Sequence, residues 1–117
     1  MLKIKKIDEQ NYDACVEEYY TCGNYTILRR VCGNNRNYFF ARANEGASQF
    51  LPGIYHNYPS RFRNPDTESE RFKKGYFYIQ TTAYGGLELD EYGEFIKAVS
   101  HAQKVAEALT EYFIKED

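Results

Sequence analysis

The sequence is poor in the residues from which metal centres and nucleophilic active sites are built. It has two histidines and three cysteines in 117 residues, and the cysteines show no CxxC spacing. Because a metal site needs three or four converging ligands, we expect neither a metal nor a cofactor. Glycine-rich phosphate-binding patterns are also missing. These absences disfavour an enzyme and leave His56, in an aromatic stretch, as the candidate for a catalytic base.

Long apolar segments are missing as well. No apolar run approaches the ~20 residues that span a bilayer. Charged residues occupy the N-terminal positions at which a signal peptide would be apolar. The odd number of cysteines, Cys15, Cys22 and Cys32, is typical of free thiols in a reducing compartment. We therefore expect a cytoplasmic protein without a membrane partner.

What the sequence has in excess is tyrosine and phenylalanine, interleaved with positive charge. Residues 25–84 hold 13 of the 20 aromatic side chains. The formal charge is +5 over residues 25–80 and −5 over residues 81–117, within a total of −2. Aromatic rings that alternate with arginine suit single-stranded nucleic acid or a protein interface. The alternative is that basic strands and an acidic helix merely face each other or water.

The first third of the chain predicts a strand, a helix and a hairpin. Apolar residues and lysines alternate over residues 2–7, which is typical of an edge strand. Apolar positions 12, 15, 16 and 19 then lie on one helical face, with Asp8 as the cap and Gly23-Asn24 as the end of the helix. Residues 25–32 and 37–43 are rich in β-forming residues on either side of Gly33-Asn34-Asn35, which predicts a β-hairpin.

Regular periodicity fades from residue 44 to residue 74, a stretch that contains all three prolines. We expect either a functional loop here or a short strand near 50–55 and a helical turn near 66–74. Residues 76–83 predict a strong strand and residues 87–89 a short returning one. A long helix then begins at a cap on Asp90, and its apolar stripe places Phe95, Val99 and Leu109 in the core.

Together these elements predict one α+β domain over residues 1–117. The order is β-α-β-β-loop-β-β-α, and the expected architecture is a two-layer sandwich. In it an antiparallel sheet is covered on one face by the long C-terminal helix.

Two segments resemble known families. Residues 2–16 resemble the first strand and helix of GNAT acetyltransferases. The acyl-CoA-binding turn of that family, Q/R-x-x-G-x-G/A, is missing, so the resemblance does not imply acetyl transfer. The order from Tyr25 to Phe113 resembles Whirly-type modules, which bind single-stranded nucleic acid. That resemblance implies a free sheet face with basic and aromatic side chains as the contact surface.

The favoured function is a small non-enzymatic binding protein with single-stranded nucleic acid as its first expected partner. A protein-interaction or homo-oligomeric module, such as a homodimer, is the alternative, and an enzyme that uses His56 is the third. The candidate binding residues lie on the predicted hairpin and in the loop that follows: Arg29, Arg42, Tyr55, His56, Tyr58, Arg61, Phe62, Arg63, Lys73 and Lys74.

Overall fold

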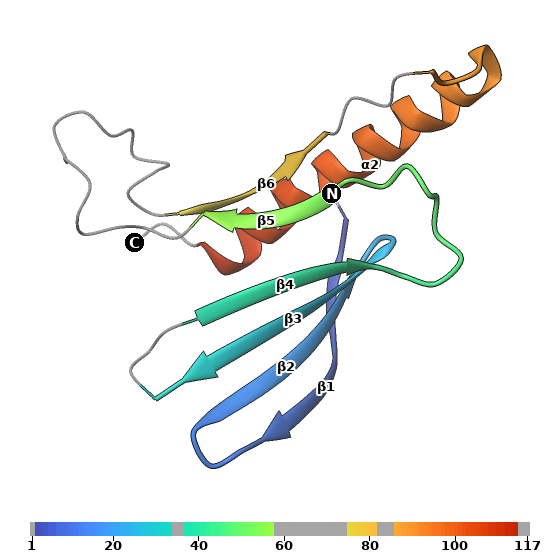
Figure 1. Ribbon diagram of the computed structural model, residues 1–117. Coiled ribbons are helices and arrows are strands. Elements are labelled where there is room, and N and C mark those ends of the chain that lie inside the picture. Colours follow the sequence, from blue (N-terminus) through green and yellow to red (C-terminus); the bar gives the residue numbers. More distant parts are fainter. Residues whose placement is uncertain (1, 34–36, 58–74, 82–85, 115–117) are drawn as a thin grey trace, which may run out of the picture.

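The computed structural model describes residues 2–33, 37–57, 75–81 and 86–114 (Figure 1). Strands precede one long helix along the chain: β1 (Ile4–Asn11), β2 (Cys15–Cys22), β3 (Tyr25–Cys32), β4 (Asn37–Ala43), β5 (Gly53–Asn57), β6 (Tyr76–Gln80) and α2 (Leu89–Phe113). β1 to β4 form an antiparallel meander in chain order, and β5 pairs antiparallel with β6. The predicted α+β architecture is therefore confirmed, although its element order matches only roughly.

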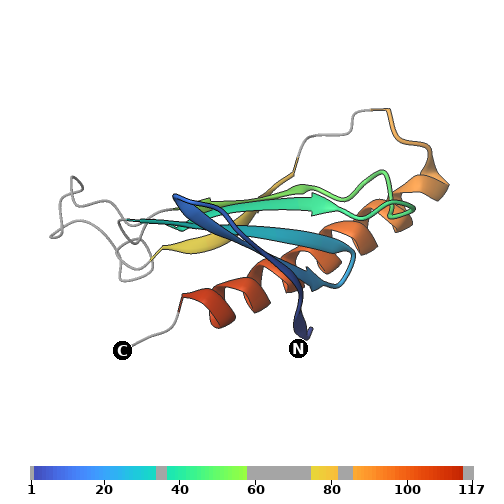
Figure 2. The ribbon, with the colours of Figure 1, turned by 90° about the horizontal axis from the view of Figure 1, so that it is seen from below.

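The two sheets lie next to each other as one layer, and α2 runs along one face of it. β5 lies beside β4 (Figure 1), and Figure 2 shows the helix on one side of the layer, with the N-terminal end of β1 reaching down to the level of the helix. Directly opposed residues of antiparallel strands project from the same face, so the pairing register assigns each side chain to a face.

We call the face that α2 covers the inner face and the other the outer face. Core residues identify the inner face: Tyr20, Cys22, Tyr25, Ile27, Phe39, Ile54, His56 and Phe77. The outer face carries the alternate residues: Lys5, Asp8, Gln10, Cys15, Glu17, Tyr19, Thr21, Thr26, Leu28, Arg30, Cys32, Tyr38, Phe40, Arg42, Tyr55, Tyr76 and Tyr78.

The core forms where α2 meets the inner face. Val105 and Leu109 of the helix are fully buried in one cluster with Tyr20 and Ile27 of the sheet. The buried positions of α2 are otherwise alanines, Ala98, Ala102, Ala106 and Ala108. Their small side chains let the helix backbone approach the strands closely, so the larger residues of the sheet fill the space between the layers.

The turn between β2 and β3 rests against α2. Gly23 has a φ of 56°, a left-handed conformation that glycine adopts without strain. The backbone N–H of Asn24 donates a hydrogen bond of 3.0 Å to Nε2 of His101 on the helix. A Cβ atom on Gly23 would lie 2.6 Å from the His101 ring. Glycine is therefore required twice here, by its backbone conformation and by the close contact with the helix.

The helix predicted after Asp8 is wrong. Its residues form the second half of β1 and the whole of β2, and Gly23-Asn24 is a hairpin turn rather than the end of a helix. Cys15 was expected on the buried face of that helix, but it lies partly exposed on β2. The resemblance to GNAT acetyltransferases loses its support as well, since it rested on a strand followed by a helix.

The later elements follow the prediction more closely. The hairpin over residues 25–32 and 37–43 is confirmed, and the strands expected near 50–55 and 76–83 are β5 and β6. Residues 87–89 do not form a strand, because Glu88 is the N-cap of α2 in a reciprocal capping box with Glu91. Asp90 is therefore in the first turn of the helix and is not its cap. The helical turn expected near 66–74 lies outside the described residues.

The apolar stripe predicted for the helix is only partly buried. Leu109 is buried, but Phe95 and Val99 are only partly buried and Ile96 is 63% exposed. The reason is visible in Figure 1, where the N-terminal part of α2 extends past the ends of the neighbouring strands. Only the C-terminal half of the stripe reaches the sheet.

Replacing Leu109 by alanine should therefore cost about 2–5 kcal/mol of unfolding free energy, because it opens a cavity in the contact between the layers. Ile96→Ala, on the same helix but exposed, is the matched control and should cost less than about 1 kcal/mol. Urea unfolding of both variants measures the difference. Equal losses for the two variants would show that the buried face of α2 is assigned wrongly.

Candidate binding surface

The outer face carries side chains in rows that cross the four-stranded sheet. One row is apolar on three strands, where it joins Tyr19, Leu28 and Phe40 through the pairing of β2, β3 and β4, and it ends at Asp8 on β1. The next row has a cation at each end, Lys5 on β1 and Arg42 on β4, with threonines between them. Along β4, an apolar ring and a positive charge are therefore two residues apart, which is the spacing of neighbouring side chains on one face of a strand.

β5 and β6 extend this surface with three tyrosines. Tyr55 and Tyr78 are directly opposed and have ring centroids 5.8 Å apart. Tyr76 lies beside Tyr78, again at 5.8 Å. Phe40 is 52% and Tyr55 47% exposed, which is unusual for rings of this size. The outer face thus presents accessible π-surfaces on both sheets.

The cations of the outer face differ in how they are held. Arg30 forms an ion pair with Glu17 at 3.0 Å and lies 5.5 Å from the centroid of the Phe40 ring. Arg42 is exposed and makes no ion pair with any described residue in the structure. Among the described residues, Arg42 therefore has no carboxylate partner to give up to an incoming anion, whereas Arg30 does.

Five acidic residues of the C-terminal part lie on the helix: Asp90, Glu91, Glu94, Glu107 and Glu111. Glu94, Glu107 and Glu111 are exposed on α2, on the opposite side of the strand layer from Arg42. The outer face carries the cations Lys5, Arg30 and Arg42 together with the carboxylates of Asp8 and Glu17, so the carboxylates of α2 do not add to it. The acidic total charge does not make the outer face acidic.

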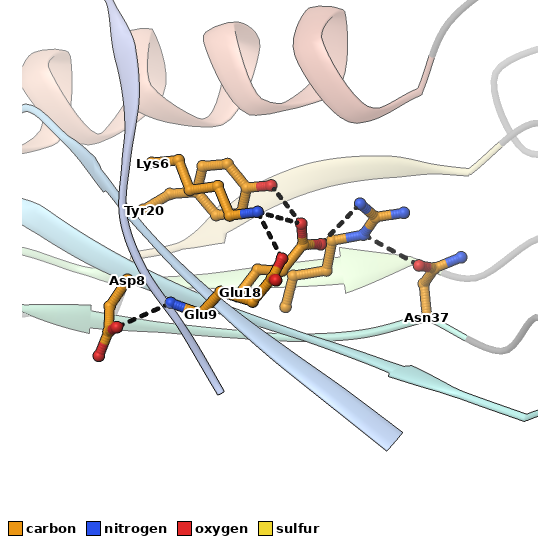
Figure 3. A network of polar contacts seen from close by, with 7 residues as sticks. Lys6, Asp8, Glu9, Glu18, Tyr20 and Asn37 are labelled. Atoms are coloured by element: carbon orange, nitrogen blue, oxygen red, sulfur yellow. Dashed lines mark hydrogen bonds and ion pairs between the residues drawn. The ribbon is translucent and has the colours of Figure 1, made fainter. Parts of the chain in front are cut away.

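A polar network occupies the inner face where the sheet extends past the helix (Figure 3). Glu18 binds Arg29 at 2.9 Å and Lys6 at 3.1 Å, and it accepts a hydrogen bond from the Tyr20 hydroxyl. Burial by itself raises the pKa of Glu18, but the hydrogen bond from Lys6 and the charge of Arg29 outweigh it, and the pKa is lowered. Arg29 also lies 5.7 Å from the centroid of the Phe113 ring.

His56 is packed between two rings on the inner face. Its imidazole lies 4.7 Å from the ring of Phe39 and 4.8 Å from that of Phe77. Burial lowers its pKa to about 4, so the ring is neutral at pH 7. Cys15 and Cys32 project from the opposite face, and Cys22 is buried in the core. His56 therefore has a packing role, and neither thiol of the outer face can act with it as a nucleophile.

The structure separates the predicted site residues. Arg42 and Tyr55 lie on the outer face, whereas Arg29 and His56 lie on the inner face. The remaining candidates are outside the described residues and stay predictions: Tyr58, Arg61, Phe62, Arg63, Lys73 and Lys74.

Sequence reasoning missed Phe40 and Tyr78 as surface residues. The signal was present in the alternation of Tyr38, Phe40 and Arg42 along one strand. Alternation identifies two sets of residues but does not say which set the helix covers. That choice needs the position of α2.

Comparisons with protein-family models, with curated proteins and with solved structures gave no match. No helix among the described residues is long and apolar enough to cross a membrane. Within the same residues, no group of three or more histidine, cysteine, aspartate or glutamate side chains is placed to hold a metal ion. The surface itself is therefore the basis for a functional proposal.

The buried His56 makes stability depend on pH. Its pKa in the folded protein is about 4, below the ordinary value of ~6.5 that it takes in the unfolded chain. The unfolded state binds the proton first as the pH falls, so stability is lost between about pH 6.5 and pH 4. Thermal unfolding should show a melting temperature that decreases between pH 7 and pH 5 in the wild type and decreases less in His56→Phe. Parallel pH profiles would contradict the burial of His56.

Proposed function

We propose that the protein is a non-enzymatic binding protein that holds single-stranded nucleic acid on the outer face of its strand layer. The observation that carries this proposal is the exposure of Phe40 and Tyr55 on one face with the guanidinium of Arg42, which makes no ion pair with any described residue. Bases stack on aromatic rings with about 1–3 kcal/mol each, and they do so without regard to sequence. Arginine supplies the contact to the phosphates.

The charge distribution supports a polyanion as the ligand. A strand bound across the outer face would meet Lys5 and Arg42 at the two ends of one row and would lie away from the carboxylates of α2. Asp8 pairs with Tyr19 at one end of the aromatic row, and Glu17 in the neighbouring row is already neutralised by Arg30. The face is therefore more favourable for an anion than the total charge suggests.

Three variants test this function in a titration of a fluorescent oligothymidine, followed by anisotropy at several salt concentrations. Phe40→Ala and Tyr55→Ala should each weaken binding about 5- to 150-fold, because each removes a stacking surface. They should leave the salt dependence unchanged. Arg42→Ala should lower the slope of log K against log salt by roughly 0.7, the value for one phosphate contact on a single strand.

Lys104→Ala is the matched control for Arg42→Ala, since it removes an exposed cation from α2 and not from the outer face. The control should bind like the wild type. No binding at 20 mM salt, or an equal loss of slope in Lys104→Ala, would contradict the proposal.

The second candidate function is a homo-oligomeric module, and the exposed apolar part of α2 favours it. Leu89 is 91% exposed, and Ile96 and Tyr92 follow on the same side of the helix at seven and three residues from it. Phe95 and Val99 border an open groove next to them. Exposed apolar positions at this spacing are typical of helix pairing.

Light scattering distinguishes the two functions. A homodimer through α2 should have twice the mass of the chain, persist at 1 M salt and dissociate in Ile96→Glu. A monomer at high concentration would exclude this candidate and leave the nucleic-acid proposal unaffected.

A further inference from the structure

Two of the three cysteines lie directly opposite each other on neighbouring strands. In the register of β2 and β3, Cys15 pairs with Cys32 at the end of the hairpin remote from Gly23-Asn24. Both side chains project from the outer face and are partly exposed. Both are free thiols in the structure.

The register also places this pair at a position suited to a covalent bond. The two-residue turn closes on Cys22 and Tyr25, which form the hydrogen-bonded pair next to such a turn. Hydrogen-bonded and non-hydrogen-bonded pairs alternate along an antiparallel ladder. Cys15 lies seven residues before Cys22, with no register shift in between, so Cys15 and Cys32 form a non-hydrogen-bonded pair.

In such a pair the Cα atoms are ~4.5 Å apart and the side chains are closest. A disulfide spans Cα separations of about 4.4–6.8 Å. The two strands can therefore be bridged with little movement of the backbone. A hydrogen-bonded pair would hold its side chains farther apart.

We propose that Cys15 and Cys32 are a redox site that forms an intramolecular disulfide on reaction with a small-molecule disulfide such as oxidised glutathione. One protein thiolate attacks a sulfur of the oxidant, forms a mixed disulfide and releases the first reduced thiol. The other protein thiolate then attacks the protein-bound sulfur, closes the Cys15–Cys32 bond and releases the second reduced thiol. The two protons of the protein thiols pass to the two released thiolates, and the oxidant is reduced by two electrons.

The surroundings of Cys15 set the rate of this reaction. Partial burial and the neighbouring Cys32 raise the pKa of Cys15, while the charge of Arg30 opposes the rise. The thiolate is therefore the minor form at pH 7, and only the thiolate attacks a disulfide. The rate of bridging should rise roughly tenfold from pH 7 to pH 8.

Cys22 serves as the internal control. It projects from the inner face, is 1% exposed, and burial raises the pKa of its thiol. It can reach neither of the other two thiols across the sheet. The proposal rests on the register of β2 and β3 and does not require that the outer face binds nucleic acid.

The test incubates the full-length protein with oxidised glutathione and maps the disulfides by mass spectrometry of non-reduced peptides. We expect a Cys15–Cys32 link in the wild type and in Cys22→Ala, with the loss of two hydrogens from the intact mass. We expect the bridge to raise the melting temperature by roughly 10 °C, because it closes a loop in the unfolded chain. Cys15→Ser and Cys32→Ser should show neither change.

A variant that combines Cys32→Ser with Val31→Cys checks the role of the register. Residue 31 pairs with Val16 on the inner face, so its thiol would point away from Cys15 although the sequence separation is nearly the same. This variant should remain unbridged. A link as fast as in the wild type, a link to Cys22, or a stable glutathione adduct on Cys15 or Cys32 without an internal bridge would overturn the proposal.

Discussion

The docking of α2 on the sheet is the contact on which the rest of the structure depends. Val105 and Leu109 are fully buried in one cluster with Tyr20 and Ile27 of two neighbouring strands and with Phe77 of β6. This contact decides which of the two sets of alternating side chains is removed from water. Burial of apolar surface at the inner face supplies most of the stabilisation. The same contact leaves the alternate side chains on the outer face, which α2 does not cover.

The roles of the charged side chains depend on which face of the strand layer they occupy. On the inner face, where the helix ends, Glu18 is satisfied by Arg29 and Lys6 and serves the fold. On the outer face Arg42 has no ion pair with a described residue and lies two residues from the exposed ring of Phe40. Two arginines from the same basic segment therefore have different roles, and the face of the strand explains the difference.

The parts of the fold with strong local signals could be predicted. The sequences of β3 and β4 are rich in β-forming residues on either side of Gly33-Asn34-Asn35, and α2 has a long helical period. β2 could not be identified because both of its faces have nearly the same composition. The inner face has valine, glutamate, tyrosine and cysteine, and the outer face has cysteine, glutamate, tyrosine and threonine. The strand therefore shows no alternation of polar and apolar residues. Its pairing with β1 and β3 is what makes this segment a strand.

The candidate surface could be predicted only in part, for a similar reason. Composition located the aromatic and basic residues in the middle of the chain, but it grouped Arg29 and His56 with Arg42 and Tyr55. The register separates these two pairs onto opposite faces. The face on which a side chain lies depends on how the strands pair in the layer and on the position of α2. A one-residue shift would exchange the two sets.

The central claim is that one face of the strand layer is covered by α2 and the other is open to a ligand. Solvent paramagnetic relaxation, measured on the aromatic resonances with a soluble gadolinium chelate, tests it most directly. The account predicts strong broadening for Phe40 and Tyr55, which are about half exposed, and protection for Tyr25 and Phe77, which are 1% and 2% exposed. Protection of Phe40 and Tyr55 in the free protein would contradict it.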